Sequence, residues 1–318
     1  MRVLLTGSSG WLGRCLAPML RAQGHDVIGL DHAPGIETGI VGTVADSALV
    51  ASVFDAHRFD GVIHAAALHK PDIARHPRQA FVDTNVTGTL HLLEAAVRHG
   101  VGRFVFTSTT SLMITAAIRE ERGAAAVWLD EESGPLRPRN IYGATKRAAE
   151  DLCRLVHADH RLPVIVLRTA RFFPEDDDTH RDLSGENMKA NEFLNRRLTV
   201  EDCARAHIVA LNQAPRIGFG LYIVSAPTPF RPAEAGALKS DAAAVIARHF
   251  PAAPALYAAR GWSLPAGIGR VYDASAIARD LGFRCRTDFA AVLDALGTGG
   301  PLPFAHDPAY VSPAAGDR

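Results

Sequence analysis

Tyr142 and Lys146 carry side chains that could perform acid–base chemistry together. They lie four residues apart in the segment Ile141-Tyr142-Gly143-Ala144-Thr145-Lys146, which we expect to begin a helix. Because four residues is slightly more than one helical turn, both side chains would leave the same helix face and reach one bound molecule or each other. A fixed positive charge stabilises a phenolate. Lys146 is therefore predicted to lower the pKa of Tyr142 toward the range of a general base.

A glycine cluster near the N-terminus indicates a dinucleotide site. The apolar run from Arg2 to Thr6 predicts a strand, and it leads without a gap into the cluster and then into residues with helical apolar spacing. In such a turn glycines permit a tight bend and a close approach of the backbone to a pyrophosphate, which faces the N-terminus of the helix. The residues predicted to contact the cofactor here are Gly7, Ser9, Gly10, Trp11, Leu12 and Gly13.

Asp31 ends the second predicted strand, Val27–Asp31. It lies about 20 residues beyond the glycine cluster, where an acid accepts hydrogen bonds from the ribose hydroxyls. A carboxylate there would repel a 2′-phosphate, and no arginine follows it directly. The sequence therefore favours NAD over NADP as cofactor. The alternative is a solvated loop aspartate.

Small residues follow the next predicted strand. The run from Gly61 leads into Ala65, Ala66 and Ala67, whose small side chains would let the backbone lie against a flat ligand. His64 within this run is expected to be a hydrogen-bonded core histidine. Lys70, in the loop beyond, is a candidate for the substrate cleft.

Asn85 and a group of hydroxyls are further candidates. Asn85 lies on a predicted helix from Phe81 to Val97, where its amide could bind a ligand or a backbone carbonyl. The strand Arg103–Phe106 runs straight into five hydroxyl residues, Thr107 to Ser111. Because ligands bind beyond the carboxyl ends of parallel strands, we expect one of these hydroxyls to hold a substrate oxygen for Tyr142.

The remaining elements are predicted more coarsely. Residues 116–138 are expected to form a helix or excursion on the surface, and residues 171–187 a loop on the substrate side. Strands are predicted at 163–168 and 221–224, and helices from 200 and over 241–249. We expect residues 1–168 to form mainly the dinucleotide-binding domain with the Tyr–Lys helix. Residues 169–297 would form mainly the substrate-binding portion, partly interleaved with the sheet, and residues 298–318 a loosely held tail.

Composition argues against several classes of partner. Of 318 residues, 47% are apolar, and the 34 basic residues are balanced by 34 acidic ones. Nothing indicates a nucleic-acid or membrane surface, which would show as a basic stripe or a long apolar run. The four cysteines form no C-x-x-C pair, so no metal site is expected. A cytoplasmic location is the default.

Taken together, the motifs resemble those of a known enzyme family. In chain order they are Thr6-Gly7-x-x-Gly10-x-x-Gly13, Asp31, His64-Ala65-Ala66, Asn85-Val86-x-Gly88-Thr89, Phe106-Thr107-Ser108-Thr109, Tyr142-Gly143-Ala144-Thr145-Lys146, Arg168, and Arg270-Val271-Tyr272-Asp273 through Phe283. This set resembles the extended short-chain dehydrogenase/reductase family, in its NAD-dependent epimerase/dehydratase branch. The resemblance covers about residues 1 to 295. It implies an α/β fold, a doubly wound parallel (Rossmann) sheet with a smaller C-terminal substrate-binding portion.

The resemblance also implies roles. Tyr142 would be the base that takes a proton from a substrate hydroxyl as hydride leaves the same carbon for NAD. Lys146 would bind the nicotinamide ribose and hold Tyr142 ionised. Thr109 would hydrogen-bond the reacting oxygen, with Ser108 as the neighbouring candidate. The family pattern adds Val44, Asn85 and Thr107 to the cofactor contacts, and implies a homodimer formed through the helices after Asn85 and Tyr142.

Departures from the family pattern concern the substrate. Thr43 stands where an aspartate commonly contacts adenine, and Thr110-Ser111 replaces the Asp-Glu pair of 4,6-dehydratases, which disfavours dehydration. Arg171 stands at about the place of a substrate-holding asparagine. It could clamp a carboxylate or phosphate, or pair with the acids of Glu175–Asp178. We expect an enzyme acting on a sugar or sugar nucleotide, as a dehydrogenase or an epimerase. The rival is a non-catalytic NAD sensor or scaffold.

Overall fold

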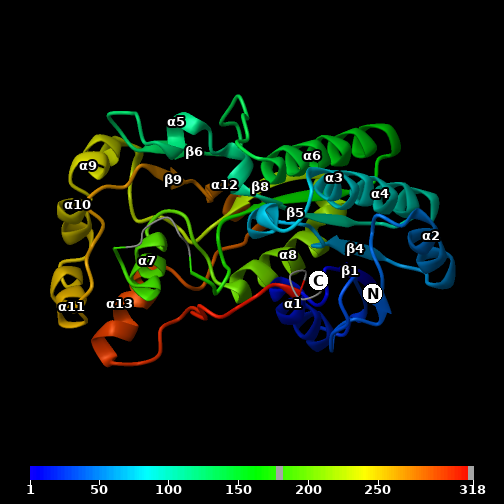
Figure 1. The fold of residues 1–318 in the computed structure, drawn as a ribbon, viewed down its shortest axis with the longest axis horizontal. Helices are drawn as coiled ribbons and strands as arrows, with labels where there is room; N and C mark the ends of the chain where they lie inside the picture. The colour runs from blue at the N-terminus through cyan, green and yellow to red at the C-terminus, as the bar shows by residue number, and fades with distance from the viewer. Residues whose placement is uncertain (177–181, 314–318) are drawn as a thin grey trace.

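An open parallel sheet forms the centre of the molecule (Figure 1). The structure is a computed structural model that describes residues 1–176 and 182–313. The strand order is β3-β2-β1-β4-β5-β7-β8, and each neighbouring pair is parallel. The strands are β1 Arg2–Thr6, β2 Asp26–Asp31, β3 Ile40–Val41, β4 Gly61–His64, β5 Phe104–Thr109, β7 Val164–Thr169 and β8 Phe219–Val224. The order reverses between β1 and β4, as in a doubly wound fold, which confirms the predicted fold class.

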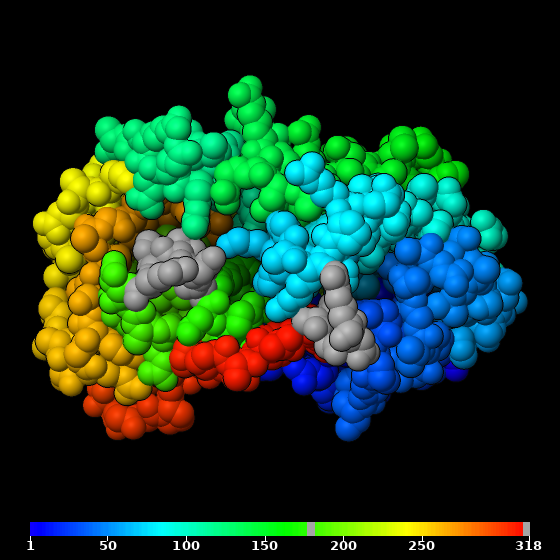
Figure 2. Space-filling model, in the orientation of Figure 1, coloured from blue at the N-terminus to red at the C-terminus, as the bar shows by residue number. Residues whose placement is uncertain are grey.

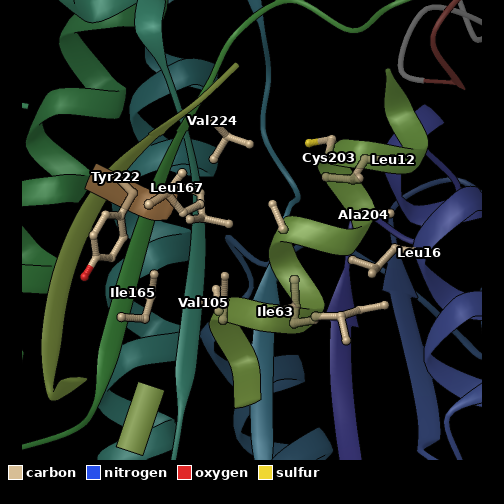
Figure 3. Packing of buried hydrophobic residues seen from close by; sticks show 14 of the residues in the cluster. Leu12, Leu16, Ile63, Val105, Ile165, Leu167, Cys203, Ala204, Tyr222 and Val224 are labelled. Atoms are coloured by element: carbon tan, nitrogen blue, oxygen red, sulfur yellow. The ribbon is translucent and has the colours of Figure 1, made fainter. Parts of the chain in front are cut away.

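Helices cover both faces of this sheet because its strands are apolar on both sides. Helices α1 (Trp11–Ala22) and α8 (Val200–Ile217) pack on one face, where Leu16 and Ala204 meet Ile63 and Val105 (Figure 3). The other face is covered by α2 (Ser47–Ala56), α4 (Gly88–Arg98) and α6 (Ile141–His160). The strand residues alternate between the two clusters, Val3 and Leu5 in one and Leu4 in the other.

The helix predicted from Phe81 to Val97 is longer and is interrupted. It comprises α3 (Arg78–Val82), a π-helical turn (Asp83–Thr87) and α4. Asn85 lies in the π turn. Such single wide turns inside helices are frequent at functional sites, because they displace one side chain from the regular spacing.

A smaller lobe is built mainly from the C-terminal part of the chain. Strand β6 (Val127–Leu129) pairs in parallel with β9 (Arg270–Tyr272) in a two-stranded sheet. The predicted surface excursion therefore contributes a strand beyond its short helix α5 (Ala116–Arg119). The lobe also contains α7 Gly185–Glu192, α9 Ala235–Ser240, α10 Ala242–His249, α11 Ala253–Ala259 and α13 Phe289–Thr298, whose apolar side chains form a separate cluster. Helix α12 (Ser275–Leu281) packs against α8 and β8 instead.

Helix α7 corrects one predicted boundary. Residues up to Asn187 were expected to be loop, but α7 begins at Gly185 because the Ser184 side chain accepts a hydrogen bond from the Asn187 amide.

The segment after α13 is held against the body at two aromatic side chains, contacts that the prediction of a loosely held tail did not include. Phe304 is only 8% exposed and stacks on Phe193 at a centroid distance of 5.4 Å. Further along, the ring of Tyr310 meets Trp11 edge-on at 5.3 Å. Figure 2 shows this red segment crossing the surface from the C-terminal lobe to the blue N-terminal half. Glycine and proline content alone did not reveal these aromatic anchors.

Among the described residues, no helix has both the length and the apolar character needed to cross a membrane.

Candidate active site

A cavity of about 1140 Å³ lies where the strand order reverses. This volume exceeds the ~300–1,000 Å³ of most small-molecule pockets, so it can hold a dinucleotide and a second ligand. The predicted site residues that line it are Gly7, Gly10, Trp11, Leu12, Asp31, Val44, Ala65, Ala66, Ala67, Lys70, Thr107, Ser108, Thr109, Tyr142, Lys146 and Arg171. Ser9, Gly13 and Asn85 lie behind the lining.

The glycine turn after β1 has no room for side chains. Gly7 has a positive φ of 74°, and a Cβ on it would lie 2.7 Å from the Ala66 amide nitrogen. A Cβ on Gly13 would lie 2.2 Å from the Gly7 carbonyl oxygen, so Gly13 serves the packing of α1 on the turn. Helix α1 has no side-chain cap and no acid in its first turn. Gly10, Trp11 and Leu12 at its start line the cavity, and the positive end of a helix fits a pyrophosphate.

Asp31 is held rigidly at the end of β2. Its Oδ2 accepts a hydrogen bond from the Ser9 amide at 2.9 Å, and its Oδ1 accepts one from the Ala33 amide at 3.0 Å. The residue is 6% exposed, so the alternative of a solvated aspartate is wrong. Its hydrogen bond to His32 raises the pKa of that imidazole. Ser9 thus acts through its backbone, by orienting the carboxylate, whose remaining lone pairs can accept ribose hydroxyls.

His64 is the buried core histidine that the sequence predicted. Its ring nitrogens lie 2.7 Å from Thr6 Oγ1 and 3.0 Å from Thr89 Oγ1. The Thr89 hydroxyl donates to the Asn85 carbonyl, so His64 Nε2 must donate to Thr89 and Nδ1 must accept from Thr6. Burial, and then the charge of Lys146, hold the pKa of His64 well below its usual value. The resulting neutral chain of hydrogen bonds ends at the Ala66 amide, which donates to Thr6 Oγ1 and so fixes the alanine loop.

Asn85 holds the same loop from the other side. Its Oδ1 accepts from the Leu68 amide, and its Nδ2 donates to the Leu68 carbonyl, both at 2.9 Å. Nδ2 also lies 3.1 Å from Thr145 Oγ1 on α6. The sequence left open whether this amide binds a ligand or a backbone carbonyl, and the structure shows it bound to the backbone of Leu68. Asn85 ties the cavity wall to the helix that carries Tyr142.

Helix α6 places Tyr142 and Lys146 on the cavity wall. It begins after Asn140, whose side chain accepts a hydrogen bond from the Gly143 amide at 2.9 Å. Tyr142 shares a hydrogen bond with Thr109. The Lys146 ammonium lies 4.0 Å from the centroid of the Phe106 ring.

The predicted lowering of the Tyr142 pKa is not found. Burial raises it to about 12, against the opposite effect of the hydrogen bond from Thr109, and Lys146 is not among the groups that shift it. Burial also lowers the pKa of Lys146 to about 7. The prediction was wrong because it counted the charge on Lys146 and omitted the loss of solvation of both groups.

The hydrogen bond of the Ser108 side chain goes to Glu150. Its hydroxyl donates to Glu150 Oε1 at 2.5 Å, and Glu150 also pairs with Arg168. Thr109 is therefore the hydroxyl next to Tyr142. Ser108 instead joins the ion pair of Glu150 and Arg168. Sequence reasoning missed Glu150, although its spacing on α6, four residues beyond Lys146, was a usable signal.

Thr107 is oriented by a buried histidine. His207 Nδ1 lies 2.8 Å from the Cys203 carbonyl, to which it must donate, so Nε2 accepts from the Thr107 hydroxyl at 2.8 Å. Burial lowers the pKa of His207 to about 4, which keeps the ring neutral. His207 lies 100 residues from Thr107 in the chain, and no local pattern predicted it.

The substrate end of the cavity contains a shared carboxylate. Glu192 lies 4.0 Å from Arg171, 3.2 Å from Arg196 and 2.9 Å from Arg197. Burial alone would raise the pKa of Glu192, but the three guanidinium groups outweigh it and hold the value at about 2. The structure thus adds Glu192 to the candidate partners of Arg171. Asp177 and Asp178 lie outside the described residues.

Val44 lies just after β3, is buried, and lines the cavity beside Thr43, the residue that departs from the family pattern.

The family profile described as "NAD dependent epimerase/dehydratase family" matches residues 3–218. The chain belongs to this family. Membership confirms the resemblance drawn from the motifs, and with it the assignment to an NAD-dependent enzyme family.

Individual relatives match only part of the chain. The chain is 30% identical over 185 residues to "UDP-glucose 4-epimerase 4" of Oryza sativa subsp. japonica, which covers 52% of this chain and 48% of that protein. It is 35% identical over 188 residues to "dTDP-glucose 4,6-dehydratase" of Streptomyces niveus, covering 53% of each. "L-arabinose 1-dehydrogenase (NAD(P)(+))" of Haloferax volcanii is 32% identical over 182 residues, covering 55% and 69%. The chain spans about half the length of the first of these curated relatives.

Solved structures share the fold. A UDP-glucose 4-epimerase of Thermus thermophilus in complex with NAD superimposes with a TM-score of 0.62 at 22% identity, over 93% of this chain and 99% of that one. A short-chain dehydrogenase/reductase of Agrobacterium tumefaciens with bound NAD gives a TM-score of 0.65 at 22% identity, over 94% and 96%.

Proposed function

We propose that this protein is an NAD-dependent oxidoreductase or epimerase that acts at a hydroxyl-bearing carbon of a sugar or nucleotide sugar. The observation that carries the proposal is a single cavity lined by the glycine turn, Asp31, and the Tyr142–Lys146–Thr109 group. Relatives named as epimerases, dehydratases and sugar dehydrogenases support the same class of substrate. The absence of the Asp-Glu pair after Thr109 continues to disfavour dehydration.

The residues present fit NAD. The uncapped N-terminus of α1, reached through Gly7 and Gly10, would hold the pyrophosphate, and Asp31 the adenosine ribose. Lys146, whose side chain reaches the cavity wall, would bind the nicotinamide ribose. When bound, NAD supplies the hydride acceptor and the positive charge of its nicotinamide ring.

Tyr142 would take the proton from the substrate hydroxyl while the C–H bond of the same carbon breaks and its electron pair leaves as hydride. Thr109 would hold the reacting oxygen next to Tyr142, and its hydrogen bond favours the phenolate. The products are then a carbonyl compound and NADH, with the proton on Tyr142. In an epimerase the hydride would return to the opposite face of the same carbonyl carbon, and the proton on Tyr142 would return to the carbonyl oxygen.

Replacing Tyr142 by phenylalanine tests the catalytic role. We expect Tyr142→Phe to abolish NADH formation or epimerisation and to leave NAD binding near normal in a titration, because the ring remains and only the hydroxyl is lost. Tyr257→Phe is the matched control, since the Tyr257 hydroxyl is buried in the C-terminal cluster and has no hydrogen-bond partner among the described residues. Full turnover by Tyr142→Phe would refute the catalytic role, whereas NAD binding without any turnover by the wild type would favour the sensor or scaffold.

The state of the copurified cofactor separates the two enzyme classes. An epimerase regenerates NAD in each turnover and gains from holding it tightly, whereas a dehydrogenase must release NADH. Chemical analysis of the cofactor extracted from the purified protein distinguishes the two classes: tightly held NAD that copurifies with the protein favours an epimerase.

The proposal extends to assembly and location. A homodimer through α4 and α6 is supported by Leu155 on α6, which is exposed although apolar. Replacing Leu155 by glutamate should shift the mass in size-exclusion chromatography with light scattering from dimer to monomer. We expect the protein in the cytoplasm, which fractionation of expressing cells would test.

A further inference from the structure

The C-terminal segment from Asp307 to Pro313 forms part of the cavity wall. Tyr310, Ser312 and Pro313 line the cavity together with the start of α1. Figure 2 shows the red segment reaching the blue N-terminal half of the chain. The family profile ends at residue 218, so it assigns no role to these residues.

Backbone hydrogen bonds hold this segment in place. The Asp307 amide donates to the Pro174 carbonyl at 2.9 Å. The Asp307 side chain accepts from the Ala309 amide at 3.0 Å, and the Asp307 carbonyl accepts from the Tyr310 amide at 3.1 Å. These two bonds close a tight turn directly before Tyr310, as aspartate side chains commonly do. The turn therefore determines the direction in which the Tyr310 side chain leaves the segment.

The Tyr310 ring packs against the first residue of α1. It meets the Trp11 ring edge-on, with 5.3 Å between the centroids and an angle of 65° between the planes. Trp11 follows Gly10, at the end of α1 that fits a pyrophosphate. The Arg14 guanidinium, almost one turn further along α1, lies 5.6 Å from the centroid of the Trp11 ring. The Tyr310 phenol is thus held beside the positive end of this helix.

The Tyr310 hydroxyl has a proton to donate. Burial raises the pKa of Tyr310 against the opposing charge of Arg14, and the charge of Glu175 adds to the rise, so the phenol stays protonated. Its oxygen accepts hydrogen bonds from Arg14 and from the Trp11 backbone amide. Both of these groups can only donate, so they leave the phenol proton unused. Over residues 1–176 and 182–313, no acceptor is found for this proton.

We propose that the Tyr310 hydroxyl donates a hydrogen bond to the pyrophosphate of NAD, so that the segment from Asp307 to Pro313 completes the cofactor site. This inference rests on the NAD site of the proposed function. A phosphate oxygen is charged, and a hydrogen bond to a charged acceptor is about twice as strong as one between neutral groups. The affinity for NAD therefore depends on the C-terminal segment as well as on the glycine turn.

Calorimetric titration of the full chain, freed of copurified cofactor, tests the contact without relying on turnover. The ligands are NAD, ADP-ribose, which keeps the pyrophosphate, and adenosine, which has no phosphate. We expect Tyr310→Phe to weaken the binding of NAD and of ADP-ribose by the same factor, roughly 10-fold, the lower end for a hydrogen bond to a charged group. The binding of adenosine and the thermal stability should stay unchanged, because the ring that contacts Trp11 remains.

Tyr257→Phe is the matched control, because it removes a tyrosine hydroxyl from the C-terminal cluster, and it should bind all three ligands as the wild type does. Unchanged NAD binding by Tyr310→Phe would overturn the inference and leave the proposed function standing. Tighter NAD binding by this variant would also overturn it, because the hydroxyl would then compete with the cofactor for the Trp11 amide. A wild type that binds adenosine but neither NAD nor ADP-ribose would refute both the contact and the proposed function.

Discussion

Glu150 and Arg168 form a buried ion pair beneath the candidate active site, with Arg168 Nη2 2.8 Å from Glu150 Oε2 and Arg168 Nε 3.1 Å from Oε1. Ser108 donates to the same carboxylate. One side chain on α6 therefore holds the ends of β5 and β7 against the helix that carries Tyr142.

Breaking this pair should destabilise the protein strongly. Glu150→Gln leaves the Arg168 guanidinium buried without a counter-charge, and we expect a loss of ~3–5 kcal/mol in the free energy of unfolding. Chemical denaturation measures it. The double variant Glu150→Gln, Arg168→Met should be less destabilised than the sum of the single variants, because no unpaired charge remains. A loss below ~1 kcal/mol for Glu150→Gln would show that the pair contributes little.

Lys146 should make stability depend on pH in a defined window. Its pKa in the folded protein is about 7 and its ordinary value 10.5, so the unfolded chain binds more protons between these values. Burying the ammonium is thus unfavourable below pH 7, and this penalty is relieved as the pH rises toward 10.5. We expect Lys146→Met to be more stable than wild type at pH 6 and to lose that advantage by pH 10. An advantage that is constant with pH would contradict the lowered pKa.

Gly13 should tolerate no side chain. In Gly13→Ala the new methyl would meet backbone atoms of Gly7 and Ser8 at 2.2 and 2.6 Å, and backbone cannot move aside cheaply. We expect a loss of ~1–3 kcal/mol, together with weaker NAD binding because α1 is displaced.

The matched control for this change is Gly236→Ala, on the exposed side of α9, where nothing lies within 4 Å of the new methyl. It should be neutral or stabilising by up to ~1 kcal/mol, as expected for alanine in a helix. Thermal denaturation of Gly13→Ala and Gly236→Ala tests this prediction. Equal stability of the two variants would show that the glycine turn can adjust to the new methyl.

Phe304 should anchor the C-terminal segment. Its ring fills a place beside Phe193 in the C-terminal cluster, and Phe304→Ala would leave a cavity there, at a cost of ~3–5 kcal/mol. Val311→Ala, at an exposed apolar residue of the same segment, should have an effect within ~0.5 kcal/mol. Limited proteolysis followed by mass spectrometry would show whether cleavage after residue 300 becomes faster in Phe304→Ala only.

The sequence predicted those parts of the site that depend on local spacing. The glycine turn, Asp31, and the pair Tyr142 and Lys146 each lie within one strand–turn–helix unit or one helix, where periodicity determines which face a side chain takes. The central strands could be predicted equally well, because strands buried on both faces appear as continuous apolar runs in the sequence.

Contacts between residues far apart in the chain could not be predicted from local spacing. Arg270 reaches the cavity through the pairing of β6 with β9, two strands of three residues each, too short to stand out in a pattern, and Glu192 reaches it from the end of α7. The pKa of Tyr142 was predicted in the wrong direction because burial, which has no sequence signature at one residue, outweighs a neighbouring charge. The roles of Ser108 and Asn85 likewise depend on Glu150 and Leu68, which only the fold brings to them.

The packed C-terminal segment bears on how the protein should be produced. Pro313 lines the cavity, so a purification tag fused behind the last residue would begin only five residues from the ligand site. Met1 precedes β1, whose opposite end carries the glycine turn, so a tag there is separated from the cavity by a strand of five residues, ~16 Å. Recombinant protein for all kinetic and calorimetric work should therefore carry its tag at the N-terminus.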